Sequence, residues 1–525
     1  MSTAVRNVRL LLLGAGVALA FADSSIVVLA LPELLQRFQA SIAGVAWVIT
    51  SYNVAVAVAA LPLVRLARRA NPARLARRGL VVFGLASLAC ALAPSLWTLV
   101  GFRSVQGLGG AMLLAASLPV ARALAEDAAR GTRGWAAAGT FGVAVGPAAG
   151  GALTQAFDWR AIFLAQAPVA AGALLATVGR TARVDGPPPE ASRRRALGAG
   201  VGLVFLSGAL VGALFLVVVL LVDVWGYGPL AAAALVSALP AGTLVTRRLG
   251  SSTAGGALLL GSGLAAIALA PGSAPVWTAG GLFLCGAGFG LAAPRLTATA
   301  GPWSVAARHA GLVAGLVLLT PVLAADLTNA SAAAERAGTA LVLDAPVPTA
   351  TKVPLAADLL TAIRHTPHGA LPEFSEVFAQ HERTPALARL HRSLDDTIRA
   401  VVTRGFRRAF LLAALLALPL LSAARPRASN TVLLGRGTAA AGAVAALLVA
   451  ELAAGGLSYG RVAVRNPCRP PPTVPGGGLD PAAQRIVLRG VDELACRLGR
   501  SREQLVLDAA ARARAAQRWV ERTFG

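Results

Sequence analysis

The chain has 525 residues, of which 56% are hydrophobic and 14% charged, and its mean hydropathy is +0.67. Soluble domains are about 45–50% apolar and about 25% charged, so the composition excludes an ordinary soluble protein. The formal net charge of +24 could indicate a nucleic-acid partner, but the arginines gather at the ends of apolar runs. That placement is typical of topology signals in membrane proteins, so we expect a lipid bilayer and no nucleic acid.

Apolar runs of about 20 residues recur along the chain, and an α-helix of that length crosses a hydrocarbon core. Inside lipid every backbone amide needs a partner within its own segment, so each run is predicted to be a helix. The fold class is therefore an all-α membrane protein. The predicted spans are 10–31, 44–64, 79–96, 98–121, 135–157, 161–179, 198–224, 229–246, 255–271, 275–294, 306–325, 409–424 and 434–457.

The first twelve spans form two six-helix halves, a plan common in transporters that hold substrate near the bilayer midplane. One extra span and a small helical tail follow them. We expect an N-terminal half over 1–180, a cytoplasmic linker over 181–197, the first five spans of the C-terminal half over 198–325, an extracytoplasmic loop domain over 326–405, the twelfth span over 406–424, the extra span over 431–458 and the soluble tail over 459–525.

Arginines predict the orientation in a cell (inner) membrane. With the N-terminus in the cytoplasm, the short outer loops hold only Arg37 and Arg160, while the segments opposite are rich in arginine and include Arg308. If the extra span exists, the tail is extracytoplasmic. Cys468 and Cys496 would then lie in an oxidising compartment, where they can pair; the alternative is two free thiols in a cytoplasmic tail.

The first span contains FADSSIVVLALPEL, residues 21–34, and Asp23 is the one acid in the middle of this apolar run. Burying a carboxylate in a membrane is costly, which makes it a functional candidate. In a low-dielectric bundle such a group can bind and release a proton near neutral pH. The alternative is a structural carboxylate that a neighbouring amide or water satisfies.

The fourth span places Arg103 within membrane depth, and a buried arginine needs a partner. Asp23 is the expected partner, and an Arg–Asp pair that breaks on protonation can link a proton to a conformational change. Three further polar side chains lie within predicted spans and are candidates for a substrate pathway. They are Gln106, Asn53 and Gln166.

The fifth span contains small residues around a proline, which allow close approach of another helix and a kink. We expect them to serve helix packing and conformational change, although such pairs also occur in static membrane helices. They are Gly142, Gly146, Pro147, Gly150 and Gly151.

Three of these strings, in this order, resemble signatures of the major facilitator superfamily, most of all its drug:proton antiporter branches. The first string resembles D-x-T-I-V-x-x-A-L-P and is matched at Asp23, Ile26, Val27, Ala30, Leu31 and Pro32. The fourth-span string resembles R-x-x-Q-G-x-G and is matched at Arg103, Gln106, Gly107 and Gly109. The fifth resembles G-x-x-x-G-P-x-x-G-G, matched at the five residues named above, and DWRAIFLAQAPVA resembles the start of the family's sixth span, with Gln166 in place of asparagine.

The resemblance implies a secondary active transporter, not an enzyme, that works by alternating access without a cofactor or metal. It further implies proton-coupled export of a small, lipophilic molecule. Substrate, direction of transport and oligomeric state are left open.

One departure concerns the gating loop after the second span, where the family carries an aspartate and Arg68 stands in its place. The loss motivates an alternative function, a non-transporting protein of this fold that presents its outer loop and tail to an envelope partner. The basic residues of the loop remain. They are Arg65, Arg68, Arg69, Arg77 and Arg78.

Two further acids receive no role in transport. Asp223 is expected at the outer end of its helix, facing the interface, and Glu451 lies in the extra span.

Overall fold

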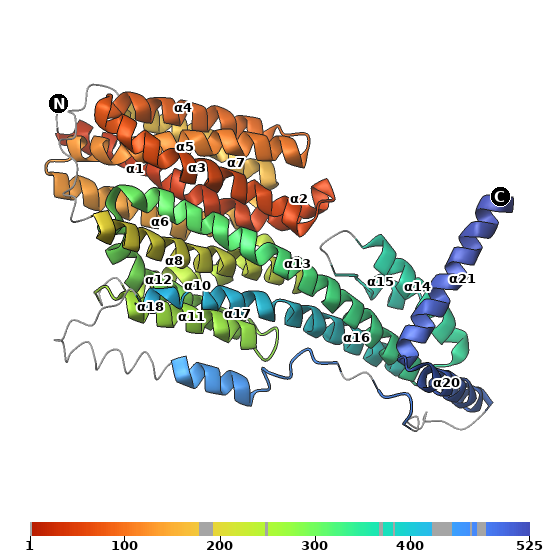
Figure 1. The fold of residues 1–525 in the computed structure, drawn as a ribbon. Coiled ribbons are helices and arrows are strands. Elements are labelled where there is room, and N and C mark those ends of the chain that lie inside the picture. Colours follow the sequence, from red (N-terminus) through yellow and green to blue (C-terminus); the bar gives the residue numbers. More distant parts are fainter. Residues whose placement is uncertain are drawn as a thin grey trace. The chain divides into compact units, whose positions relative to one another are not determined.

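A computed structural model describes residues 3–177, 193–246, 250–366, 371–381, 384–422, 444–462, 465–469 and 479–524. Within these ranges the chain forms helices and no strand, which confirms the predicted all-α fold (Figure 1). The chain divides into two compact units. Unit 1 consists of Met1–Ala324 with Phe406–Leu457, and unit 2 of Ala325–Gly405 with Ser458–Gly525.

The first half of unit 1 contains the helices that correspond to the first six predicted spans. Polar residues cap several of them: the Oγ of Ser41 accepts a hydrogen bond from Gly44, and the side chain of Asn71 accepts one from Ala73. The helices are α1 (Thr3–Ile26), η1 (Val27–Ala30), α2 (Leu31–Phe38), α3 (Ile42–Arg69), α4 (Pro72–Ala91), α5 (Leu96–Leu124), α6 (Ala128–Ala156), α7 (Trp159–Leu174) and η2 (Leu175–Thr177).

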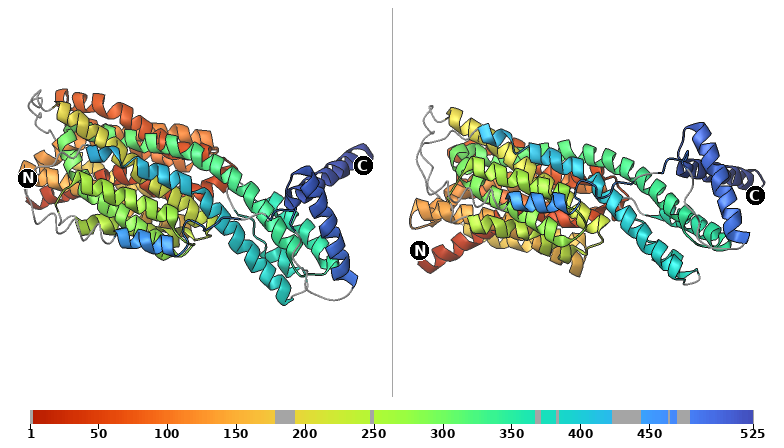
Figure 2. Two further views of the ribbon diagram at one scale, coloured as in Figure 1. Left: turned by 60° about the horizontal axis from the view of Figure 1, so that its bottom comes forward. Right: turned by 90° about the horizontal axis from the view of Figure 1, so that it is seen from below.

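The second half of unit 1 lies alongside the first, and its long helices run in the same bundle (Figures 1 and 2). Its seventh span ends in a π-helical turn, η4, a feature found often at functional sites. The helices are α8 (Arg193–Val219), η4 (Leu220–Val224), α9 (Pro229–Val236), α10 (Ala238–Thr246), α11 (Thr253–Leu269), α12 (Pro275–Ala300), η5 (Gly301–Trp303), α13 (Ser304–Asp344), α17 (Arg407–Leu415), α18 (Pro419–Ser422) and a helix over Val444–Ala453.

By length and composition, 7 helical stretches of the described chain can cross a membrane, or up to 8 if a bent pair within α6 counts as one span. One of these stretches, Pro275–Asp344, contains both α12 and α13. Other predicted spans are not among these stretches. The helix α11 is shorter, and α4 contains arginines. The multi-pass membrane fold stands, and the predicted number of thirteen spans stays a prediction.

Glycines set the distance between many helices of unit 1, as expected where close backbone contact replaces a hydrophobic driving force. A Cβ built on Gly208 would lie 3.0 Å from the carbonyl oxygen of Gly311, which joins α8 to α13. On α11 and α12, Gly256 and Gly288 face each other in the same way: a Cβ added to either glycine would lie 2.5 Å from the carbonyl oxygen of the other. No larger side chain fits at these contacts without moving a helix.

Three predicted boundaries differ from the structure. The linker was predicted to extend to 197, but α8 begins at Arg193, because 193–197 continue into the apolar helix without a breaker. The first span reaches from Thr3 to Phe38 rather than over 10–31. The eleventh was expected to end at 325, but α13 continues to Asp344 through an alanine-rich stretch, since alanine favours helix. Residues 178–192 and 423–443, which include most of the linker and the start of the extra span, lie outside the described residues.

Unit 2 combines two segments that were predicted as separate pieces, the loop 326–405 and the tail 459–525. The two segments are joined by side-chain contacts: Arg502 donates to both carboxylate oxygens of Asp344, at 2.8 and 2.9 Å. Within the tail segment, Cys468 forms a disulfide with Cys496. Besides the end of α13, the helices are α14 (Thr349–His365), α15 (Ser375–Ala379), α16 (Pro385–Gly405), α20 (Leu479–Leu498) and α21 (Arg502–Phe524).

The start of α14 also contacts the tail segment. The carboxylate of Asp480 accepts hydrogen bonds from the backbone N–H of Thr349 at 3.3 and 3.4 Å. Hydrogen bonds from Thr349, first from its side chain and then from its backbone N–H, hold the pKa of Asp480 below its usual value. Lys352 donates to Gln484 at 3.1 Å, so the loop and tail segments are tied at several points.

Candidate functional site

An ion pair lies within the first half of unit 1, far from bulk water. Asp23 on α1 and Arg103 on α5 are both 0% exposed, and Nη1 of Arg103 contacts Oδ2 of Asp23 directly. The two side chains expected to meet from the sequence are therefore in contact, and their charges cancel inside the bundle.

The guanidinium of Arg103 has further partners besides the carboxylate. Its Nη1 donates to Oε1 of Gln106 at 2.6 Å, and its Nε donates to the carbonyl oxygen of Val48 at 2.9 Å. Its Cζ lies 4.6 Å from the ring centroid of Tyr52, within cation–π range. Its Nη2 has no hydrogen-bond partner among the described residues. These contacts stabilise the cation in addition to its pairing with the carboxylate.

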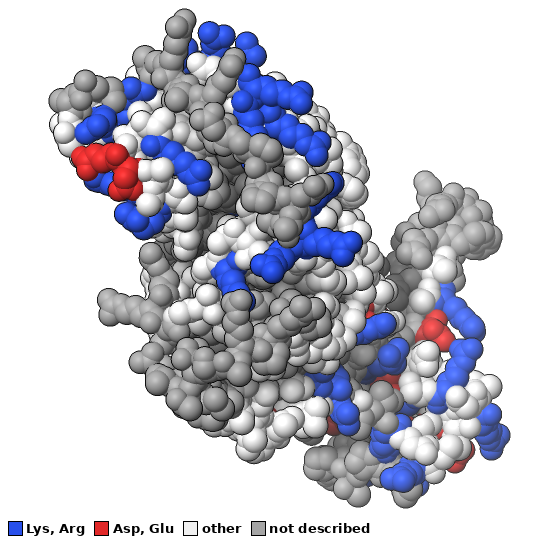
Figure 3. Space-filling model, turned by 60° about the vertical axis from the view of Figure 1, so that its left-hand side comes forward, with Lys and Arg blue, Asp and Glu red and all other residues white. Residues whose placement is uncertain are grey.

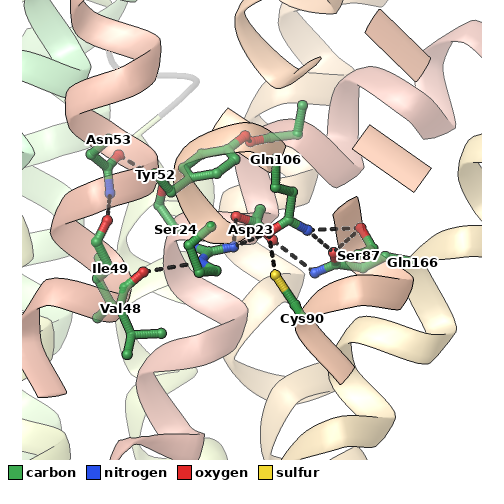
Figure 4. Close-up of polar contacts among 12 residues, drawn as sticks. Asp23, Ser24, Val48, Ile49, Tyr52, Asn53, Ser87, Cys90, Gln106 and Gln166 are labelled. Atoms are coloured by element: carbon green, nitrogen blue, oxygen red, sulfur yellow. Dashed lines mark hydrogen bonds and ion pairs between the residues drawn. The ribbon is translucent and has the colours of Figure 1, made fainter. Parts of the chain in front are cut away.

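The carboxylate of Asp23 has one amide partner in addition to Arg103. Gln166 on α7 donates from Nε2 to Oδ1 of Asp23 at 2.8 Å. Gln106 donates in turn to Oε1 of Gln166 at 2.6 Å and to Oγ of Ser87 at 2.8 Å. Four helices of the first half, α1, α4, α5 and α7, are thus joined through one buried polar network (Figure 4).

The three residues predicted to line a substrate pathway are all buried in this conformation. Gln106 and Gln166 belong to the network around the ion pair. Asn53 accepts a hydrogen bond from the hydroxyl of Ser24 at 2.9 Å and donates to the carbonyl of Ile49 at 2.8 Å. In this conformation the first two position the charged pair, and the third ties α3 to α1 next to it.

The small residues of α6 face the helix that carries Asp23. A Cβ added to Gly142 would lie 2.0 Å from the carbonyl oxygen of Ala18, and one on Gly150 would lie 2.1 Å from that of Ile26. Gly146 meets the Oγ of Ser25 in the same way, at 2.2 Å. The backbones of α1 and α6 are therefore in direct contact over more than two turns.

Two other members of the fifth-span string complete this interface. Gly151 faces α9 of the second half, where an added Cβ would lie 2.6 Å from the carbonyl of Pro229. Pro147 lies inside α6, whose two parts, Ala128–Val143 and Val145–Ala156, meet at 41°. The kinked helix α6 thus contacts both halves of unit 1.

The gating-loop arginines lie where α3 ends and α4 begins. Arg65, Arg69, Arg77 and Arg78 are exposed, and Arg68 is half-buried. Arg77 donates to the carbonyl of Thr177 at 3.0 Å, at the end of the sixth span, where a cation is favourable. Basic side chains are numerous on the face of unit 1 shown in Figure 3.

Two buried carboxylates were given no functional role from the sequence. Asp223 was expected at the interface, but it is only 9% exposed, lies in the π-helical turn η4, and its Oδ2 has no partner among the described residues. Glu451 is also buried, and neither of its carboxylate oxygens has a described partner. The one sequence feature that could have indicated burial of Asp223 is its position at the end of a long apolar run.

The start of α13 contacts the first half of unit 1. The guanidinium of Arg308, predicted from the sequence to be a cytoplasmic charge, lies 4.9 Å from the ring centroid of Phe21 on α1. The neighbouring His309 is 1% exposed and lies 6.3 Å from Phe21 and 6.4 Å from Tyr52, between ring centroids. The second half therefore places a cation and an imidazole against the helices of the first half that surround the ion pair.

Comparison with known proteins places these features in a family context. The family described as Major Facilitator Superfamily matches residues 13–325. The chain is 34% identical to the multidrug resistance protein Stp of Mycobacterium tuberculosis over 201 residues, which are 38% of this chain and 37% of that protein. It is 33% identical to a methylenomycin A resistance protein of Bacillus subtilis over 208 residues, 38% of this chain and 44% of that protein. The chain thus spans less than half the length of these relatives.

Among solved structures, a bacterial homologue of the human lysosomal transporter Spinster in an inward-facing, occupied conformation matches with a TM-score of 0.56. The match has 17% sequence identity and covers 82% of this chain and 100% of that one. The unoccupied form of the same homologue gives a TM-score of 0.53 at 18% identity, with the same coverage. At this identity the similarity concerns the fold alone.

Proposed function

The chain belongs to the major facilitator superfamily, and on that premise we propose that it exports a small, lipophilic molecule in exchange for protons. The relatives named above are drug-resistance proteins, which supports export as the direction of transport. The proposed substrate and partners are thus a small molecule and protons. The proposed orientation has the N-terminus in the cytoplasm and the tail outside.

The observation that carries the proposal is the fully buried pair of Asp23 and Arg103. Charges inside a membrane protein are costly unless paired, and removing one partner of a buried pair is strongly destabilising. A proton on Asp23 removes the negative charge and leaves the guanidinium with the weaker contacts to Gln106, Val48 and Tyr52. The protonated state therefore favours a different arrangement of α1 and α5.

A path for this rearrangement runs through α6. The glycines of α6 contact the backbone of α1 on both sides of Asp23 in sequence, at Ala18 and at Ile26. Gly151, on the same helix, contacts α9 in the second half. Because these contacts are backbone to backbone, a shift of α1 must move α6, and α6 in turn moves against the second half. This links protonation to the relative position of the halves, as alternating access requires.

A second function deserves a test because two observations favour it. Arg68 replaces the acid of the gating loop, and unit 2 is a folded domain that combines loop and tail. A non-transporting protein of this fold could present unit 2 to an envelope partner. A variant that replaces 326–405 by a short linker and ends at 457 would lose such a complex without a change in solute flux.

The test of proton coupling uses inside-out vesicles that contain the full chain. A proton gradient, acidic inside, is imposed across their membrane. We expect proton-driven uptake of a lipophilic fluorescent dye, and we expect Asp23→Asn to abolish it. Glu126→Gln is the matched control, because Glu126 is an exposed acid whose ion pairs with Arg6 and Arg130 lie at the surface. Uptake that is unchanged in Asp23→Asn would remove Asp23 from the mechanism.

A further inference from the structure

Unit 2 contains a pocket of about 680 Å³ that is partly open to solvent and belongs to no part of the transport machinery described above. Its walls come from the last turns of α13, from α14, α16 and α21, and from the segment around Phe374. The loop and tail segments therefore build it together, and neither segment forms it alone.

The walls of the cavity are mostly apolar. Leu359, Phe374, Leu394 and Ile398 line it and are each less than 9% exposed. The acids among the lining residues, Glu335 and Asp508, keep solvent-accessible side chains, and Asp508 is paired with Arg500 at 3.0 Å. No charged side chain of the described lining is buried, so the interior offers contacts to an apolar ligand and the rim offers contacts to a polar group.

The pocket has the size of a ligand site. A volume of about 680 Å³ lies within the range of small-molecule pockets, about 300–1,000 Å³. Protein interiors are close-packed, and the few natural voids larger than a water molecule are small, so a space of this size is not an ordinary gap between side chains.

Polar contacts fix the walls around this space. Arg502 at the start of α21 is 2% exposed and holds Asp344 at the end of α13 through two hydrogen bonds. Two residues that line the cavity are close to this pair in the sequence: Val342 comes shortly before Asp344, and Val506 follows Arg502 by one helical turn. The ion pair therefore holds α13 and α21 together beside the cavity, so that the pocket is preformed rather than opened by a ligand.

We propose that unit 2 is a binding domain for a lipophilic molecule with a long apolar body, such as an acyl chain, and a polar head that stays at the rim. Two sources share this chemistry, a lipid of the surrounding membrane and a lipophilic substrate delivered by unit 1. Binding itself does not depend on proton coupling, so it can be tested when the proposed function fails.

The experiment uses the full chain in lipid nanodiscs and hexadecanol that carries a photoreactive diazirine in its chain, because a neutral head group is compatible with the acids at the rim. After irradiation, mass spectrometry identifies the labelled peptides. We expect labelling in peptides of α14, α16 and α21, and at least a fivefold decrease in Ile398→Trp, which fills the cavity. Ile486→Trp is the matched control, because Ile486 is an exposed residue of the same unit outside the cavity.

If Ile398→Trp fails to fold, as judged by loss of the Cys468–Cys496 disulfide, Ala510→Phe narrows the cavity from α21 instead. Labelling that is equal in the cavity variant and the control, or absent from unit 2 of the folded protein, overturns the proposal.

A second arm distinguishes the two sources of ligand in energised inside-out vesicles. If the photoreactive alcohol reaches unit 2 through transport, Asp23→Asn lowers labelling of unit 2; if it comes from the bilayer, labelling stays the same. Both results support binding, and only the first supports a role of unit 2 in export.

Discussion

Replacing either member of the buried pair should destabilise the protein, and by different amounts. In Arg103→Met the Asp23 carboxylate keeps only the hydrogen bond from Gln166 and becomes an uncompensated buried charge. Removing one partner of a buried ion pair costs about 3–5 kcal/mol, so we expect a loss of unfolding free energy in that range.

In Asp23→Asn the remaining charge is better stabilised. The Arg103 guanidinium keeps hydrogen bonds to Gln106 and to the carbonyl of Val48, and its contact with the ring of Tyr52. Hydrogen bonds to a charged group are worth about 1.5–3 kcal/mol each, so we expect a smaller loss, about 1–3 kcal/mol. The predicted order is therefore that Arg103→Met is less stable than Asp23→Asn.

The double variant Asp23→Asn/Arg103→Met removes both charges together and should recover part of the loss. For contacting residues the coupling energy from such a cycle is about 0.5–3 kcal/mol, and we expect the upper part of that range. The assay is reversible unfolding in detergent micelles followed by circular dichroism. Single variants that lie within about 0.5 kcal/mol of the parent, or losses that simply add, would refute a direct buried pair.

Three other predictions follow from the packing and from unit 2. Gly142→Ala should abolish proton-driven uptake and lower the midpoint of thermal unfolding, because the methyl group meets the backbone of α1, whereas Gly134→Ala in the same helix meets nothing within 4 Å and should change neither. Reduction of the Cys468–Cys496 disulfide should destabilise unit 2 by about 2–4 kcal/mol, measured as faster limited proteolysis of α20 and α21, and unchanged cleavage would contradict it. The pKa of Asp480 is lowered by hydrogen bonds from the start of α14, so its stabilising contribution is present above the ordinary aspartate pKa and is lost as the pH falls through the lowered one. The free energies of unfolding of the parent and of Asp480→Asn, measured with denaturant, should therefore differ near neutral pH and converge at acidic pH. A difference between the two that is independent of pH would exclude this role.

Much of the site could be predicted from residue type and position. Asp23 and Arg103 were recognisable because an isolated charge in an apolar run has few ways to be satisfied, and the structure brings the two side chains together. The glycines of the fifth span were recognisable as a packing surface, and the structure directs them at α1. Their spacing does not state which helix they face, so the contact with the Asp23 helix came from the fold.

Other features depended on contacts between distant parts of the chain. Arg308 looks like a topology signal in the sequence, since it lies next to a helix start, and only the packing of α13 against α1 places it beside Phe21. Asp223 looks interfacial because it ends an apolar run, and only the π-helical turn and its neighbours bury it.

The apolar runs were enough to predict the membrane-embedded helical fold, because such runs can satisfy their backbone in lipid only as helices. Short strings whose chemistry is local to one helix were enough to indicate the family. That the loop and the tail form one unit with a cavity between them could be seen only from the contacts of the folded chain. The reason is physical: hydrophobic periodicity tells which face of a helix is buried, but the partner that buries it is chosen by the complementarity of surfaces more than a hundred residues apart, as for Asp344 and Arg502.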